Sequence, residues 1–111
     1  MRYYVGIDLG GTNIAAGVCD EEFRIVGRSE GKTNAPRPVE ALCADMARIA
    51  GEAVLAAGLT MDQIEWIGVG SPGAIDPETG EIVYANNLQL VHAPAARELR
   101  RLTGKTVYME N

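Results

Sequence analysis

Two apolar runs separated by a very short glycine-containing segment constrain the fold more than any other feature. The runs Tyr3–Asp8 and Ile14–Cys19 both read as β-strands, and Gly10 and Gly11 lie between them. A connection this short joins antiparallel neighbours, because a parallel pair needs a crossover of about a dozen residues or more. The chain is therefore predicted to begin with a β-hairpin.

The remaining elements follow the hairpin in the order of an α/β domain. Arg24–Gly31 is predicted to be a third strand, and we expect these three strands to form a largely buried sheet. The apolar positions of Pro38–Ala57 form one wide helical stripe, which Gly58 ends. Further predicted elements are a strand at Ile64–Val69 that is buried on both faces, a loop at Ser71–Ala74, a turn at Asp76–Gly80, a short extended run at Glu81–Tyr84, a helix at Ala95–Leu102 and a strand at Thr106–Glu110.

This βββαβαβ order predicts a mixed five-stranded sheet with flanking helices in a single domain. The strand at Ile64–Val69 should run parallel to the first strand, because a helix precedes it. In such sheets ligands bind beyond the carboxyl ends of the parallel strands. Asp8, Ser71–Ala74 and the pair Glu110-Asn111 all fall at such ends. The sequence therefore predicts a binding site at this edge.

Composition excludes several classes of protein. The hydrophobic content of 47% and the charged content of 23% are those of an ordinary globular domain. The net charge of −5 argues against sequence-independent nucleic-acid binding, which requires a basic face. No apolar run approaches the ~20 residues of a membrane span, and Asp8 interrupts any signal-peptide core. We expect a cytoplasmic protein with neither a nucleic-acid nor a membrane partner.

The cysteines and the single histidine do not suggest a metal site. We interpret Cys19, in a strand, and Cys43, in a helix, as buried reduced thiols. Together with His92 they cannot supply a four-ligand zinc site. We interpret His92 as a surface residue that flanks a helix, and Trp66 as packing in the core or at a sheet edge.

The segment between the first two strands has the residues of a phosphate site. Gly10 and Gly11 permit positive φ and close approach of a phosphate to the backbone, and Thr12 and Asn13 add side-chain donors. An ionised Asp8 would repel a phosphate unless a cation intervened, which predicts Mg²⁺ held through water. The alternative is a plain hairpin with a capping carboxylate.

Two other glycine motifs do not fit their usual functions. Gly68–Gly73 matches the G-x-G-x-x-G pattern of a dinucleotide site, but Pro72 and a turn follow where a helix should open. Gly31-Lys32-Thr33 resembles the end of a P-loop, but Val26 stands where its first glycine is required.

Several segments together identify a family. Val5–Asn13 resembles the first phosphate motif of the actin-like, hexokinase-type ATPase fold, a ribonuclease H-like domain. The segments Gly68–Asp76, Ala85–Leu88 and Val107–Asn111 resemble the ROK family of bacterial sugar kinases and repressors, in particular its glucokinase-like members. The first motif marks only the superfamily, whereas the set is specific for the family.

The resemblance implies a role for each matching residue. The phosphates of ATP, and Mg²⁺ through Asp8, would be bound by Asp8, Gly10, Gly11, Thr12 and Asn13. A hexose, glucose in the first place, would be lined or hydrogen-bonded by Gly73, Ala74, Asn87 and Asn111.

The resemblance also implies parts that this sequence does not contain. In the family an Asp follows the asparagine that corresponds to Asn111 and acts as the general base, and this sequence ends one residue before it. A C-terminal domain with further sugar contacts, a zinc motif and the adenosine pocket would follow. We expect residues 1–111 to be the N-terminal domain of a sugar kinase, inactive alone, whose full-length form is a homo-oligomer.

Some points stay open. Ala15 stands where many relatives carry Lys or Arg near the phosphates, and Leu90 stands where Trp is frequent. The alternative function is the sugar-sensing domain of a ROK transcriptional repressor, although no basic helical segment precedes Tyr3. A non-sugar member of the actin-like superfamily is a third hypothesis, against which Asn87 and Asn111 weigh. Neither the sugar nor the donor, ATP or polyphosphate, is fixed by these residues.

Overall fold

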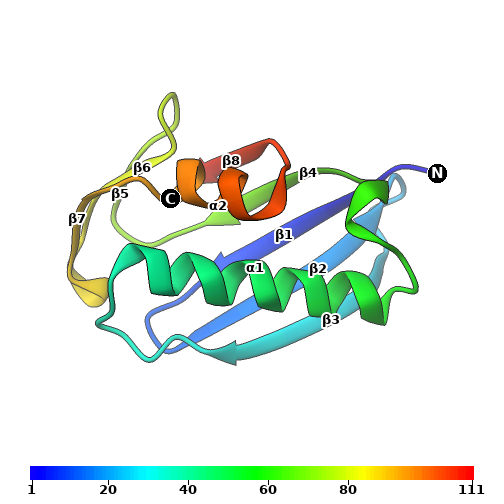
Figure 1. Cartoon of the computed structure of the whole chain (residues 1–111), viewed down its shortest axis with the longest axis horizontal. Coiled ribbons are helices and arrows are strands. Elements are labelled where there is room, and N and C mark those ends of the chain that lie inside the picture. The colour runs from blue at the N-terminus through cyan, green and yellow to red at the C-terminus, as the bar shows by residue number, and fades with distance from the viewer.

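A five-stranded mixed sheet forms the centre of the molecule (Figure 1). The computed structural model describes all residues, Met1–Asn111. The strand order is β3-β2-β1-β4-β8, and the strands are β1 (Tyr3–Leu9), β2 (Asn13–Asp20), β3 (Ile25–Lys32), β4 (Ile64–Gly70) and β8 (Val107–Glu110). Strands β1, β2 and β3 pair antiparallel, and β4 and β8 run parallel to β1. The predicted hairpin and mixed sheet are confirmed.

Two helices cover one face of this sheet. Helix α1 (Val39–Ala56) lies across β1, β2 and β3, and α2 (Ala95–Thr103) packs beside it and against β8 (Figure 1). Pro38 precedes the first turn of α1, while Gly58 and Gly104 follow the two helices with left-handed backbone, which agrees with the predicted ends. The buried side chains of the helices and of this sheet face form one core, to which Ile14, Leu42, Met46, Ile49 and Ile67 contribute fully buried side chains.

The opposite face of the sheet is not covered, and this corrects two expectations. Ile25 and Val26 were expected to be buried but are 53% and 39% exposed at the edge of the sheet. Strand β4 is buried on one face only. Trp66 packs neither in the core nor at an edge but on the open face, between Tyr4 and Tyr108, with ring centroids 4.8 and 5.7 Å apart. The cause is that both helices lie on the same side.

A second, three-stranded antiparallel sheet stands at one end of the first, and the sequence analysis missed it. It consists of β5 (Ala74–Asp76), β6 (Glu81–Ala85) and β7 (Leu90–Ala93), in the order β5-β6-β7. The expected loop at Ser71–Ala74 is confirmed except for Ala74, which begins β5, and the expected extended run Glu81–Tyr84 lies in β6. His92 lies at the surface as expected, but within β7, where it hydrogen-bonds Glu81. Two 3₁₀ turns, η1 (Met61–Gln63) and η2 (Asn86–Leu88), complete the structure.

No helix of the structure is long and apolar enough to cross a membrane.

Candidate active site

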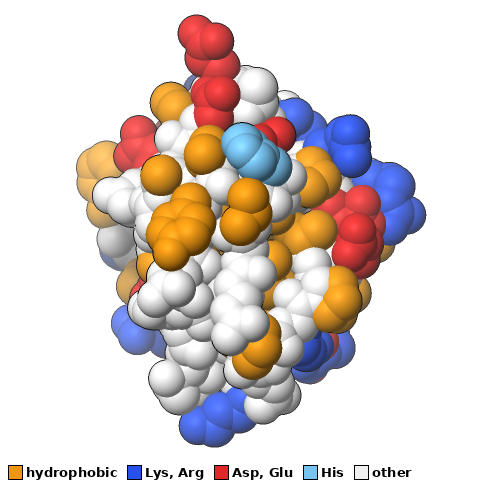
Figure 2. Space-filling view, turned by 90° about the vertical axis from the view of Figure 1, so that its left-hand side faces the viewer, with side chains coloured by type: hydrophobic (Ala, Val, Ile, Leu, Met, Phe, Trp, Pro, Cys, Tyr) orange, Lys and Arg blue, Asp and Glu red, His pale blue; other side chains and the backbone are white.

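The carboxyl ends of the three parallel strands meet at one end of the main sheet, as predicted. Asp8 in β1 pairs in register with Gly70 in β4, which pairs with Glu110 in β8. Ala15 of β2 lies on the other side of Asp8. The Asp8 carboxylate is exposed and forms no hydrogen bond or ion pair within the chain. Figure 2 views this end of the molecule, where charged side chains lie mostly around the rim.

The turn after β1 leaves backbone donors free. The Gly10 N–H donates to the Asn13 carbonyl at 2.9 Å and closes the hairpin. The N–H groups of Gly11 and Thr12 donate to no atom of the chain, and both residues are exposed. Free backbone N–H groups beside one another make a ready site for an anion. The structure therefore places donors within the segment in which the sequence predicted them.

The two glycines serve this turn differently from the way that the sequence analysis expected. Neither Gly10 nor Gly11 has the positive φ that was anticipated. A Cβ atom at position 10 would instead lie 2.8 Å from the Asn13 carbonyl oxygen, which is closer than real contacts of this kind. Gly10 is required by close approach of the chain to itself rather than by a left-handed conformation.

Asn87 lies beside this hairpin although it is far from it in sequence. A Cβ atom at Gly11 would be 3.6 Å from Asn87 Cβ and 3.8 Å from Asn87 Nδ2. Asn87 belongs to η2, and its exposed side chain forms no hydrogen bond within the chain. The turn brings a free amide group next to the free backbone donors.

Gly73 and Asn111 also come together. The Asn111 side-chain amide donates to the Gly73 carbonyl oxygen. Gly73 has a φ of 88°, and a Cβ atom there would lie 2.0 Å from the Tyr84 carbonyl oxygen, so no other residue fits. Ala74 follows as the exposed first residue of β5. The Ser71 N–H donates to the Glu110 carbonyl at 2.9 Å and joins this loop to β8.

The site is an open surface rather than an enclosed pocket. A groove of about 1010 Å³ runs along the open face of the sheet and reaches the site only at Asp8 and Gly70. A smaller hollow of about 300 Å³ lies beside Asn111, between Ile75 and Glu110. Neither concavity includes the hairpin tip and Asn87. The residues therefore form one wall.

Among the proposed ligands, only Asp8 offers a carboxylate to a metal ion. No group of three or more His, Cys, Asp or Glu side chains is arranged to hold an ion. The free carboxylate of Asp8, a few residues before the free N–H groups of Gly11 and Thr12, suits a hydrated Mg²⁺ that arrives with a nucleotide, because Mg²⁺ keeps several waters and takes one or two carboxylates plus phosphate oxygens.

One residue of this region gives no signal in the sequence. Thr33 is fully buried directly after β3, and its hydroxyl donates to the Gly10 carbonyl at 2.7 Å. In sequence, the tripeptide Gly31-Lys32-Thr33 resembles only the end of a P-loop, whose first glycine is missing. The sequence does not reveal the partner of this buried threonine, because the hydrogen bond joins the end of β3 to the turn between β1 and β2, 23 residues away.

The mixed sheet, the helix arrangement and the hairpin after Asp8 define an actin-like ATPase domain. The sequence model described as "ROK family" matches residues 4–111, and the chain belongs to that family. It is 32% identical over 108 residues to a glucokinase of Thermotoga maritima and 30% identical over 111 residues to a glucokinase of Streptomyces coelicolor. These matches cover 96% and 100% of the chain but 32% and 33% of the relatives, so the chain spans about a third of their length.

Solved structures agree with the assignment. The ROK hexokinase from Thermus thermophilus superposes with a TM-score of 0.87 at 35% identity, over 99% of this chain and 35% of that one. A ROK family glucokinase from Streptomyces griseus, in complex with glucose and AMPPNP, gives 0.86 at 30% identity, over 98% and 33%. A ROK family transcriptional regulator superposes with a TM-score of 0.84 but is only 15% identical, so it shows a similarity of fold alone.

Proposed function

We propose that residues 1–111 are the N-terminal domain of an ATP-dependent hexokinase that transfers the γ-phosphoryl group to the 6-hydroxyl of glucose. The observation that carries this proposal is the hairpin after Asp8, where the N–H groups of Gly11 and Thr12 are free and Asn87 lies alongside. Similarity to two glucokinases and to a glucokinase solved with glucose and AMPPNP supports the choice of sugar and donor.

The hairpin binds the phosphates in this proposal. The N–H groups of Gly11 and Thr12 donate to phosphate oxygens, and the Thr12 hydroxyl and the Asn13 amide add donors from their side chains. Asp8 holds Mg²⁺ through water, and when bound the ion neutralises charge on the phosphates. Catalysis of phosphoryl transfer consists mainly of such positioning and charge stabilisation.

The sugar lies next to the phosphates because its proposed ligands do. Asn87 hydrogen-bonds one hydroxyl beside the hairpin, and Gly73, Ala74 and Asn111 form the adjoining surface. The short distance between Gly11 and Asn87 supports binding of the attacking hydroxyl close to the γ-phosphate. This nearness is the geometric requirement for in-line transfer.

The proton of the attacking hydroxyl needs a base, and in this proposal neither Asp8, which holds the metal ion, nor another residue of the chain takes that role. The family resemblance assigns it to an aspartate directly after position 111, and such a base typically contributes ~10²–10⁴-fold. With one wall of a cleft and no base, the 111 residues alone are inactive in this proposal. The full-length kinase would act in the cytoplasm, where ATP is available, and as a homo-oligomer.

The proposal is tested with the full-length protein that carries this chain. Purified protein is incubated with ATP, Mg²⁺ and each of several hexoses, and ADP and sugar phosphate are measured. We expect glucose-dependent ADP release with glucose 6-phosphate as the product. Sugar binding without phosphorylation of any hexose, from either ATP or polyphosphate, would favour the sugar-sensing repressor instead.

A further inference from the structure

A buried threonine outside the predicted site hydrogen-bonds the turn between β1 and β2 from the interior of the protein. Thr33 has no exposed surface, and it makes two hydrogen bonds to the turn between β1 and β2. Its hydroxyl donates to the Gly10 carbonyl at 2.7 Å, and its backbone N–H donates to the Thr12 carbonyl at 2.9 Å. We propose that Thr33 is a positioning residue that keeps this hairpin in its anion-binding conformation, an inference that rests on the proposed function.

The two hydrogen bonds from Thr33 also orient the N–H groups of the residues that follow Gly10 and Thr12. In a planar trans peptide, the carbonyl of one residue and the N–H of the next point in opposite directions. Because Thr33 holds the Gly10 carbonyl, the Gly11 N–H points away from Thr33 and toward the free side of the turn. The bond to the Thr12 carbonyl orients the Asn13 N–H in the same way.

The Gly10–Gly11 peptide needs such a restraint more than other peptides do. Glycine populates positive and negative φ about equally, so a peptide between two glycines can rotate with little steric resistance. A rotated peptide would present the Gly10 carbonyl oxygen, instead of the Gly11 N–H, to a phosphate. An oxygen would repel the anion that the N–H attracts, and the Thr33 hydroxyl opposes this rotation.

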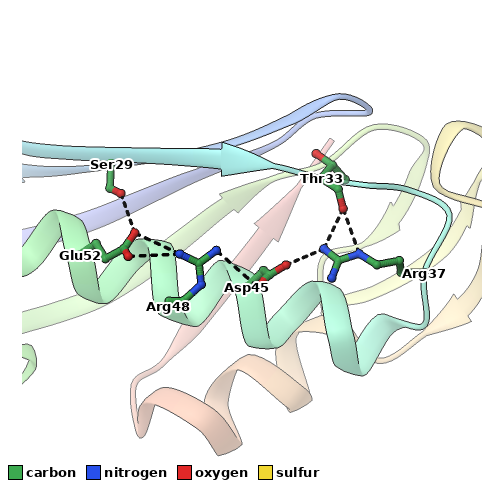
Figure 3. Close-up of polar contacts among 6 residues, drawn as sticks. All are labelled: Ser29, Thr33, Arg37, Asp45, Arg48 and Glu52. Atoms are coloured by element: carbon green, nitrogen blue, oxygen red, sulfur yellow. Dashed lines mark hydrogen bonds and ion pairs between the residues drawn. The ribbon is translucent and has the colours of Figure 1, made fainter.

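Thr33 is itself anchored to helix α1. The Arg37 guanidinium donates to the Thr33 carbonyl from Nε at 3.0 Å and from one terminal nitrogen at 2.7 Å, and that nitrogen also lies 2.7 Å from Asp45 Oδ2. Asp45 lies on α1, and hydrogen bonding to Arg37 holds the pKa of its carboxyl below the usual value. Figure 3 shows this series of contacts, which continues through Arg48 and Glu52 back to β3.

A direct ligand role for Thr33 does not fit the structure. Its hydroxyl is buried and already engaged, whereas the groups that face outward belong to Gly11 and Thr12. Its influence on a ligand must therefore pass through the hairpin. This distinguishes it from a phosphate-contacting threonine of the kind that a P-loop carries.

Steady-state kinetics of the full-length kinase test the inference. Thr33→Val removes the hydroxyl with little change of shape, Thr33→Ser keeps the hydroxyl, and Thr103→Val is a matched control. Thr103 makes a similar bond, from Oγ1 to the Leu99 carbonyl at 2.7 Å, but at the end of α2. We expect Thr33→Val to raise KM for ATP, and so to lower kcat/KM for ATP about 10- to 100-fold, while KM for glucose is unchanged. Thr33→Ser and Thr103→Val should stay close to wild type.

The two substrates separate positioning from a loss of folded protein. A smaller active fraction would lower kcat and leave both KM values unchanged. The inference is overturned if Thr33→Val keeps the wild-type kcat/KM for ATP, or if only the active fraction falls. An inactive wild-type protein would instead reject the proposed function.

Crystal structures of the wild type and Thr33→Val provide a readout independent of activity. The expected result is a rotated or disordered Gly10–Gly11 peptide in the variant and an ordered one in the wild type. An unchanged peptide in Thr33→Val would overturn the inference whatever the kinetics.

Discussion

Gly11 and Asn87 lie against one another, so that a Cβ atom at position 11 would be 3.6 Å from Asn87 Cβ. One residue belongs to the turn between β1 and β2, and the other to the 3₁₀ turn after β6. This contact joins the proposed phosphate and sugar sites into one surface.

Truncation of the Asn87 side chain should weaken the binding of the sugar and not that of ATP. We expect Asn87→Ala in the full-length kinase to raise KM for glucose up to about tenfold, because one hydrogen bond contributes ~0.5–1.5 kcal/mol. KM for ATP should remain near the wild-type value. Asn86→Ala is the control, since the Asn86 side chain hydrogen-bonds Tyr84. Equal effects of the two variants on glucose would contradict the role given to Asn87.

Gly73 should tolerate no side chain. Its φ of 88° and the 2.0 Å approach of a Cβ atom to the Tyr84 carbonyl predict that Gly73→Ala destabilises the fold, by ~1–3 kcal/mol for the backbone strain alone. Gly51 in α1 has open space around it, so Gly51→Ala should stabilise by roughly 0.5–1 kcal/mol. Urea denaturation of both variants measures the two free energies of unfolding. Opposite signs are expected, and a neutral Gly73→Ala would show that the loop can rearrange.

Asp20 should make the stability of the domain depend on acidic pH. Burial raises the pKa of this carboxyl, but hydrogen bonds from the N–H groups of Arg24 and Glu22 and from the Arg24 side chain more than offset burial, so the pKa lies below its usual value. The ionised form therefore stabilises the fold above about pH 4, and that stabilisation is lost as pH falls through the lowered pKa.

Unfolding measured between acidic and neutral pH checks this prediction. Asp20→Asn should lower the stability near neutral pH and flatten its decline in acid. Asp62→Asn, at an exposed site without an ion pair, should reproduce the wild-type curve. An Asp20→Asn curve parallel to that of the wild type would contradict the assignment.

The two thiols should differ in reactivity. Burial, with a smaller contribution from Glu98 and Glu40, raises the pKa of Cys43 to about 12, whereas Cys19 is partly exposed in the groove on the open sheet face. A thiol reagent at pH 8 should therefore modify one cysteine of the folded 111-residue chain and both in urea. Rapid modification of Cys43 in a Cys19→Ser variant would show that α1 opens readily.

The elements of the main sheet could be predicted because their signals are local. The hairpin follows from two apolar runs and two glycines, and α1 from its single stripe and its flanking Pro38 and Gly58. Which face of the sheet is covered is not a local property, and this is why Ile25 was expected to be buried. Strand β7 escaped prediction because it is short and irregular, with a φ of 48° at His92.

The candidate site shows the same division. The resemblance named Asp8, Gly73, Asn87 and Asn111 from motifs, and the structure brings them to one end of the molecule. The contact of Gly11 with Asn87 and the bond from Thr33 to Gly10 join segments that are distant in sequence. Nothing in the pattern of either segment specifies its partner, so these contacts needed the folded chain.

The most direct test of the account is the steady-state turnover of Mg²⁺-ATP by an Asp8→Asn variant of the full-length protein with glucose as acceptor. The change preserves shape and removes the charge that is proposed to hold the metal, and Asp62→Asn is again the control. We predict that Asp8→Asn lowers kcat at least about 100-fold while Asp62→Asn has no effect. Normal turnover by Asp8→Asn would contradict the assignment of this hairpin to the phosphates and their metal ion.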